Sequence, residues 1–149
     1  MKKKIDEDFL LNGYIVNKVE NIKSLEKIKD FFLKNINKNL NLKKEKIINL
    51  NKFHNHLTKS DLNKNRLLLF NQFNKNNKFQ KMYYSLAKEA IDIIVGNELA
   101  IQKNINLSIQ TPNDHSSLLP LHSDTWSGDS PFEVVLWVPL VNCYKTKSM

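Results

Sequence analysis

The residues best suited to chemistry lie between positions 119 and 140, in the run LPLHSDTWSGDSPFEVVLWVPL. His122 and Asp124 stand two residues apart there, just before a polar turn and an apolar segment. In an extended chain, side chains at i and i+2 project from the same face, so this imidazole and carboxylate would lie side by side. Such a pair supplies two of the three protein ligands of a 2-His-1-carboxylate iron site. The alternative is a His–Asp ion pair that needs no metal.

The longer run from Leu119 to Met149, LPLHSDTWSGDSPFEVVLWVPLVNCYKTKSM, resembles the Fe(II)/2-oxoglutarate-dependent oxygenases related to phytanoyl-CoA dioxygenase. It is most similar to the bacterial group found in carbohydrate and surface-polysaccharide gene clusters. The opening FLLNGYIVNKV, with a helix expected after it, also resembles the start of those enzymes. The resemblance is specific over residues 107–149 and diffuse before them.

This resemblance implies a double-stranded β-helix, or jelly roll, in which His122 and Asp124 bind Fe(II). The family adds a distant second histidine and a basic residue that binds 2-oxoglutarate, and this sequence has no match for either. We therefore expect an N-terminal fragment that is inactive alone. The expected parent is a dioxygenase that uses Fe(II), 2-oxoglutarate and O₂ to oxidise a small metabolite, with a carbohydrate-related compound as one candidate. Two alternatives stay open: a non-catalytic jelly-roll module that binds sugars, and a lysine-rich nucleic-acid binder.

Three further residues are candidate ligand contacts. Asn106 and Gln110 share the polar face of an expected strand, and in a jelly roll that face can look into the barrel. They are therefore candidates for binding the cosubstrate. Trp126 follows Asp124 by two positions and could stack on a substrate ring, or else pack under the turn.

Other histidines and one aspartate offer weaker alternatives. His115 could replace a missing metal ligand, although a histidine on a surface loop is the simpler interpretation. His54 and His56 could share a metal on a strand but would diverge on a helix. Asp129 could contact substrate or cap the turn at Gly128.

The elements that would position these residues follow from hydrophobic periodicity. We expect helices over residues 25–35, 61–74 and 78–95, with Ser24 and Asp61 as N-caps and Gly96 closing the last helix. We expect strands over residues 14–16, 99–110 and 133–140. Helices followed by strands predict an α+β fold. Residues 1–98 would form a helical N-terminal part with an initial short strand, packed on an incomplete jelly roll formed by residues 99–149.

Composition bears on partners and location. The net charge of +8 is uneven, because residues 1–90 carry a net +11 and residues 91–149 a net −3. Arg66 is the only arginine, whereas proteins that read nucleic acids favour arginine, so we expect a small-molecule substrate and no nucleic acid. The sequence has no apolar run of transmembrane length, and we expect no signal peptide because no hydrophobic segment follows the first lysines. The single Cys143 fits a reducing cytoplasm. The oligomeric state stays open.

Overall fold

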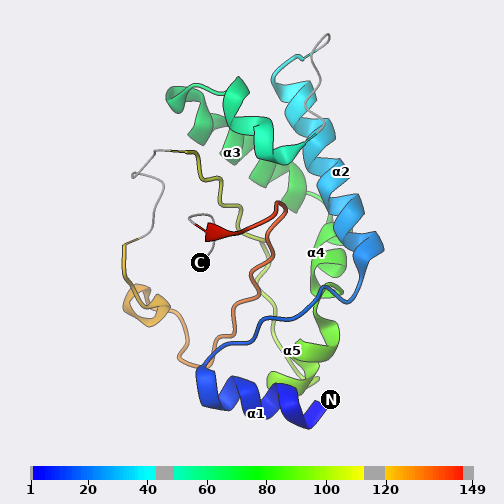
Figure 1. The fold of residues 1–149 in the computed structure, drawn as a ribbon, viewed down its shortest axis with the longest axis vertical. Coiled ribbons are helices and arrows are strands. Elements are labelled where there is room, and N and C mark those ends of the chain that lie inside the picture. The colour runs from blue at the N-terminus through cyan, green and yellow to red at the C-terminus, as the bar shows by residue number, and fades with distance from the viewer. Residues whose placement is uncertain (1, 43–48, 113–119, 146–149) are drawn as a thin grey trace.

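Three helices pack around one aromatic core in the computed structural model, which describes residues 2–42, 49–112 and 120–145. These helices are α2 (Ile22–Asn39), α3 (Lys59–Asn74) and α4 (Asn77–Tyr84). Two further helices, α1 (Lys2–Asn12) and α5 (Lys88–Ile94), lie against each other at one end of the molecule (Figure 1). Two 3₁₀ helices, η1 (Leu50–His56) and η3 (Asp124–Ser127), interrupt the loops.

Phenylalanines from three helices form the centre of the core. The rings of Phe32 on α2 and Phe73 on α3 stack with their centroids 4.9 Å apart, and Phe31 lies 4.5 Å from Phe79 on α4. Phe53 of η1 is only 6% exposed and joins the same cluster. The apolar stripes predicted from 3–4 spacing therefore face one another, as amphipathic helices require.

The starts of α2 and α3 differ from the predicted caps. Asn21 rather than Ser24 caps α2, and its side-chain oxygen accepts a hydrogen bond from the Ser24 backbone N–H at 3.0 Å. Thr58 caps α3, while Asp61 occupies the third helical position. The Thr58 hydroxyl accepts from the Asp61 N–H at 3.3 Å and donates to the Asp61 carboxylate at 2.6 Å, so it satisfies a backbone N–H in the first turn.

The single helix predicted over residues 78–95 is wrong, because α4 and α5 are separate helices. At the break, Leu86 is 1% exposed, and its carbonyl accepts a hydrogen bond from the Glu20 backbone N–H at 2.9 Å. The Glu20 carboxylate accepts from the backbone N–H groups of Glu89 at 2.9 Å and Ala90 at 3.1 Å. A carboxylate distant in sequence thus satisfies the first turn of α5, whose own N-cap makes no side-chain hydrogen bond. Gly96, with a φ of +95°, follows α5 as predicted.

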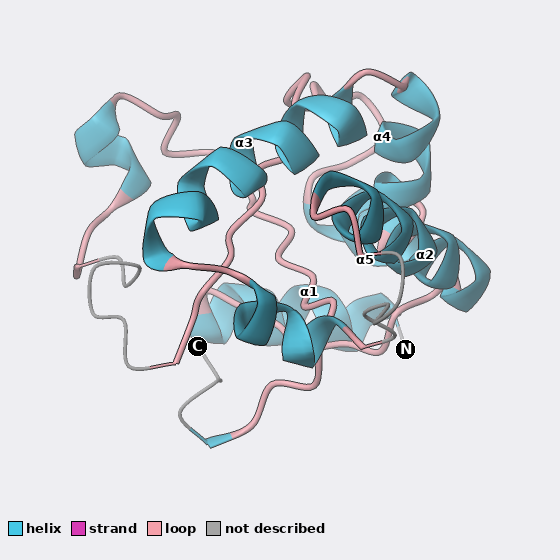
Figure 2. Cartoon of the chain, turned by 90° about the horizontal axis from the view of Figure 1, so that it is seen from above, coloured by secondary structure: helices cyan, strands magenta, loops and turns pink. Residues whose placement is uncertain are grey.

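The predicted α+β jelly roll is contradicted. Over the described residues the chain consists of helices and loops, with no β-strand (Figure 2). Residues 99–110 and 133–140 form no β-ladder in the described chain, although both are predicted to be strands. Residues 14–16 likewise form a loop rather than a strand.

The alternation in residues 99–110 was nevertheless meaningful. Ile105, Leu107 and Ile109 pack against the helical core, while Asn106 and Gln110 are exposed. A period of two shows which side of an extended chain is buried, but a sheet also needs neighbouring strands to pair its backbone. Here the buried side of residues 99–110 packs on helices. The alternation therefore identified the buried residues correctly, but it did not indicate a sheet.

Helix side chains take the place of strand partners at particular positions. The Asn74 amide donates to the Ile105 carbonyl at 3.0 Å, and its oxygen accepts from the Ile105 N–H at 2.7 Å. The Tyr83 hydroxyl donates to the Leu136 carbonyl at 2.7 Å. These bonds, rather than a β-ladder, attach the two extended segments to α3 and α4.

Candidate functional site

The His122–Asp124 pair lies on an exposed loop that turns through η3. Ser123 between them is extended, with φ −121° and ψ 136°, so the two side chains project to the same side. The loop closes at Gly128, whose φ of +95° favours glycine and whose N–H donates to Thr125 O at 3.2 Å. Hydroxyls of Ser123 and Thr125 lie 2.7 Å apart and tie the turn together.

A backbone carbonyl orients the His122 ring. The ring Nδ1 lies 2.7 Å from the Pro120 carbonyl oxygen, and because a carbonyl only accepts hydrogen bonds, Nδ1 must carry the hydrogen. In the neutral ring this leaves the lone pair on Nε2, which lies 3.5 Å from Asp124 Oδ1. Both groups then accept hydrogen bonds, so a proton, a metal ion or a water molecule that donates to each can join them.

The separation suits two neighbouring metal ligands. Imidazole nitrogens and carboxylate oxygens bind metals such as zinc at about 2.0–2.2 Å, so two ligands at a right angle would lie roughly 3 Å apart. The observed 3.5 Å between Nε2 and Oδ1 is within reach of a small side-chain rotation. His122 and Asp124 therefore fit as two ligands of one ion.

The pair does not form a complete site among the described residues. No group of three His, Cys, Asp or Glu side chains that could hold a metal occurs in that part of the chain. The side chains of His122 and Asp124 are 45% and 54% exposed, so solvent reaches both. An ion pair this exposed contributes about 0–1 kcal/mol, so stability alone gives little reason for the arrangement. His115, the alternative ligand, lies outside the described residues.

The other candidate contacts are dispersed. Asn106 and Gln110 point away from the helical core, and no hydrogen bond in the described chain connects them to the His122–Asp124 pair. Trp126 on η3 is 76% exposed, so it does not pack under the turn and stays available for stacking. Trp137 in the apolar segment is 47% exposed. In this segment Val138 and Leu140 pack against the helical core, and the Leu136 carbonyl accepts a hydrogen bond from Tyr83.

The environments of the remaining candidate residues are typical of structural groups. His54 and His56 lie on η1, where i and i+2 side chains diverge, and both are partly buried beside the core residue Phe53. Asp129 is exposed next to the η3 turn, and its backbone N–H donates to Asp124 O at 3.3 Å. Cys143 is partly buried, with its Sγ 3.6 Å from the Val141 carbonyl oxygen.

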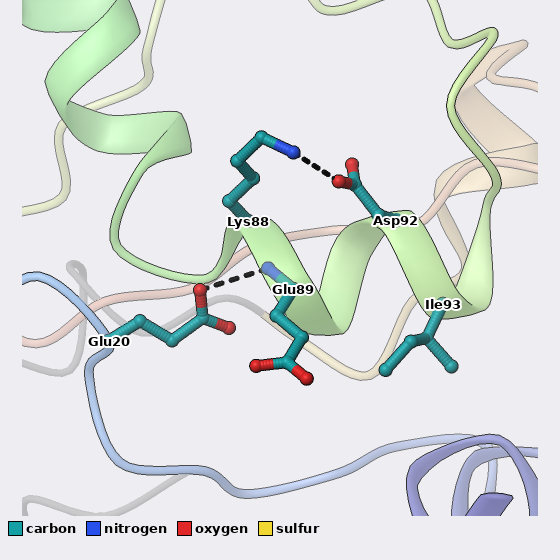
Figure 3. A pocket seen from close by; sticks show the side chains of 5 residues that line it. All are labelled: Glu20, Lys88, Glu89, Asp92 and Ile93. Carbon is teal, nitrogen blue, oxygen red and sulfur yellow. Dashed lines mark hydrogen bonds and ion pairs between the residues drawn. The ribbon is translucent and has the colours of Figure 1, made fainter. Parts of the chain in front are cut away.

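A second group of charged residues was missed by the sequence interpretation. Glu20, Lys88, Glu89, Asp92 and Ile93 line an open pocket beside α5 (Figure 3). Lys88 forms an ion pair with Asp92 four residues later. That i, i+4 spacing was visible in the sequence, whereas the approach of Glu20 was not.

Asp92 also perturbs two neighbouring groups. The Tyr84 hydroxyl donates to Asp92 Oδ1 at 2.5 Å, and this bond is the main cause of a raised Tyr84 pKa. The hydrogen bond from Lys88 to Asp92 likewise raises the pKa of Lys88. Since Glu20 already caps α5 and Asp92 binds both Tyr84 and Lys88, the polar groups of this pocket satisfy one another. We assign it a structural role.

Comparison with known proteins gives no independent identification. No protein family, curated protein or solved structure matches the chain. Among the described helices, none combines the length and apolar character that crossing a bilayer requires. Arguments about function therefore rest on the residues and their geometry.

Proposed function

We propose that His122 and Asp124 are two of the three protein ligands of a ferrous centre in a 2-oxoglutarate-dependent dioxygenase. The observation that carries the proposal is the orientation of His122. The Pro120 carbonyl, 2.7 Å from Nδ1, assigns the hydrogen to that nitrogen and turns Nε2 toward the Asp124 carboxylate. Histidine ligands to metals are typically held in this way, through a hydrogen bond from the other ring nitrogen.

The substrate would be a small metabolite, with a carbohydrate-related compound as the first candidate. Ferrous iron with 2-oxoglutarate and O₂ would supply the oxidising chemistry when bound. His122 would contribute a neutral imidazole and Asp124 a negative charge that partly offsets the charge of the metal. Trp126, exposed two positions after Asp124, is placed to stack on the face of a sugar ring. The proposal requires a third ligand from outside the described residues.

Metal binding tests the proposal without requiring turnover. The chain is titrated anaerobically with Fe(II) and 2-oxoglutarate, and the visible charge-transfer band of the Fe(II)–2-oxoglutarate chelate is recorded. We expect His122→Ala and Asp124→Ala each to weaken metal binding by more than about tenfold, since even groups that only hydrogen-bond to metal ligands are worth roughly 10–100-fold. With an incomplete ligand set, binding to the wild-type chain should be weak.

The matched control is His54→Ala, which removes a partly buried imidazole from η1. It should bind the metal like the wild type. Equal binding by the wild type, His122→Ala and Asp124→Ala would contradict the proposal and leave the pair as a metal-free ion pair. So would a strong band that disappears in His54→Ala alone.

A further inference from the structure

Two stretches of the sequence that contain no aspartate or glutamate lie together in the structure. Residues 62–88 contain six lysines and arginines and no aspartate or glutamate, and residues 99–113 contain Lys103 and no acid. The carboxylates nearest in sequence lie just outside these stretches and are Asp61, Glu89, Glu98 and Asp114. The first stretch covers most of α3 and all of α4.

Hydrogen bonds bring the second stretch to the first. The Asn74 side chain at the end of α3 binds both backbone groups of Ile105, and Gln80 Nε2 on α4 donates to the Gln102 carbonyl at 2.9 Å. Residues 102–105 are therefore fixed across the junction of α3 and α4, along the chain that returns from α5 (Figure 1). Lys103 lies between the two attachment points.

Four exposed lysines consequently share this junction. Lys75 follows α3, Lys78 and Lys81 lie on α4, and Lys103 comes from the returning segment. We call these four residues the junction patch. All four are exposed, and no ion pair to any of them occurs in the described part of the chain. Uncompensated lysines on one surface attract polyanions.

The chemistry of the patch favours a phosphate backbone over a lipid surface. Among the described large apolar side chains of α4 and residues 99–112, Ile101 alone is strongly exposed, at 49%. A surface that binds membranes normally adds apolar side chains that enter the headgroup region. The exposed side chains of Asn76 and Asn77 lie between the lysines and can hydrogen-bond to phosphate or sugar.

We propose that the junction patch binds the phosphate backbone of a nucleic acid without sequence preference. The shortage of arginine, which argued against a nucleic-acid partner at the level of sequence, bears on base readout and not on phosphate contacts. With four phosphate contacts, the logarithm of the binding constant for duplex DNA should fall with the logarithm of salt concentration with a slope of about −3.6. Affinity should thus drop about a hundredfold between 50 and 200 mM salt.

Fluorescence anisotropy with a random-sequence duplex tests this inference on the full chain. The patch variant carries Lys75→Gln, Lys78→Gln and Lys81→Gln together. Because each phosphate-contacting lysine contributes about one unit to the salt slope, the slope should shrink to about −1. Its affinity at 50 mM salt should fall by more than tenfold.

The control variant makes the same charge change on the exposed side of α2, where acidic residues alternate with lysines. It carries Lys23→Gln, Lys27→Gln and Lys34→Gln, and its salt slope should stay near the wild-type value. Circular dichroism verifies that both variants stay folded. An equal loss of DNA affinity in the two variants would overturn the inference, because the overall positive charge rather than the junction patch would then cause binding. Absence of binding at 50 mM salt, or binding to anionic lipid vesicles and not to DNA, would also overturn it.

Discussion

The Glu20 carboxylate is the group whose removal should most clearly weaken the attachment of α5. It accepts hydrogen bonds from the Glu89 N–H at 2.9 Å and the Ala90 N–H at 3.1 Å, and Ala90 is only 5% exposed. Removing an N-cap costs about 0.5–2 kcal/mol, and a negative charge at a helix N-terminus adds about 0.3–1 kcal/mol. We expect Glu20→Ala to lower the free energy of unfolding by about 1–2 kcal/mol, which corresponds to roughly 2–8 °C in Tm.

Urea denaturation followed by far-ultraviolet circular dichroism measures this loss. Glu20→Gln retains one acceptor oxygen but no charge, so it should lose about half as much as Glu20→Ala. Glu26→Ala is the matched control, because Glu26 is exposed on α2 and has no hydrogen bond in the described structure. It should stay within about 0.5 kcal/mol of the wild type. The reasoning is refuted if Glu20→Ala is as stable as the wild type, or if Glu26→Ala loses as much.

Two further predictions concern the side chains that bind the extended segments. Burial raises the pKa of Tyr83 to about 12 from 10.0, so its contribution to stability is complete below pH 10 and is lost as the pH rises toward 12. Alkaline urea denaturation should show a loss of about 2–3 kcal/mol in this range that is absent in Tyr83→Phe. Asn74→Ala removes both hydrogen bonds to Ile105 and should cost about 1–3 kcal/mol, with faster amide exchange at Ile105.

Each of these two predictions has a control variant. Tyr14 is 66% exposed, so Tyr14→Phe should leave the alkaline loss unchanged, and an identical pH profile for Tyr83→Phe and the wild type would show that Tyr83 does not cause it. Asn71→Ala removes an exposed amide from the same helix as Asn74. If it accelerates exchange at Ile105 as much as Asn74→Ala does, the effect comes from α3 as a whole.

The sequence by itself determined the local, periodic features. Apolar residues at 3–4 spacing placed Phe31, Phe32, Phe73 and Phe79 on the faces that meet in the core, because helix geometry repeats every 3.6 residues wherever the helix packs. The glycine at position 96 marked the end of α5 for an equally local reason, since its backbone adopts positive φ. The two-residue spacing of the His–Asp pair predicted neighbouring side chains, and they lie together across one extended residue.

Only the tertiary structure decided what the extended segments pair with and where the long helix breaks. Alternating residues identify the buried side of residues 99–110, yet the choice between a neighbouring strand and the side chain of Asn74 depends on packing. The division of α4 from α5 depends on Glu20, whose carboxylate reaches α5 from 69 residues away in the sequence. Hydrogen bonds between such distant groups leave no periodic pattern, and for this reason the helical fold could not be predicted from local sequence signals.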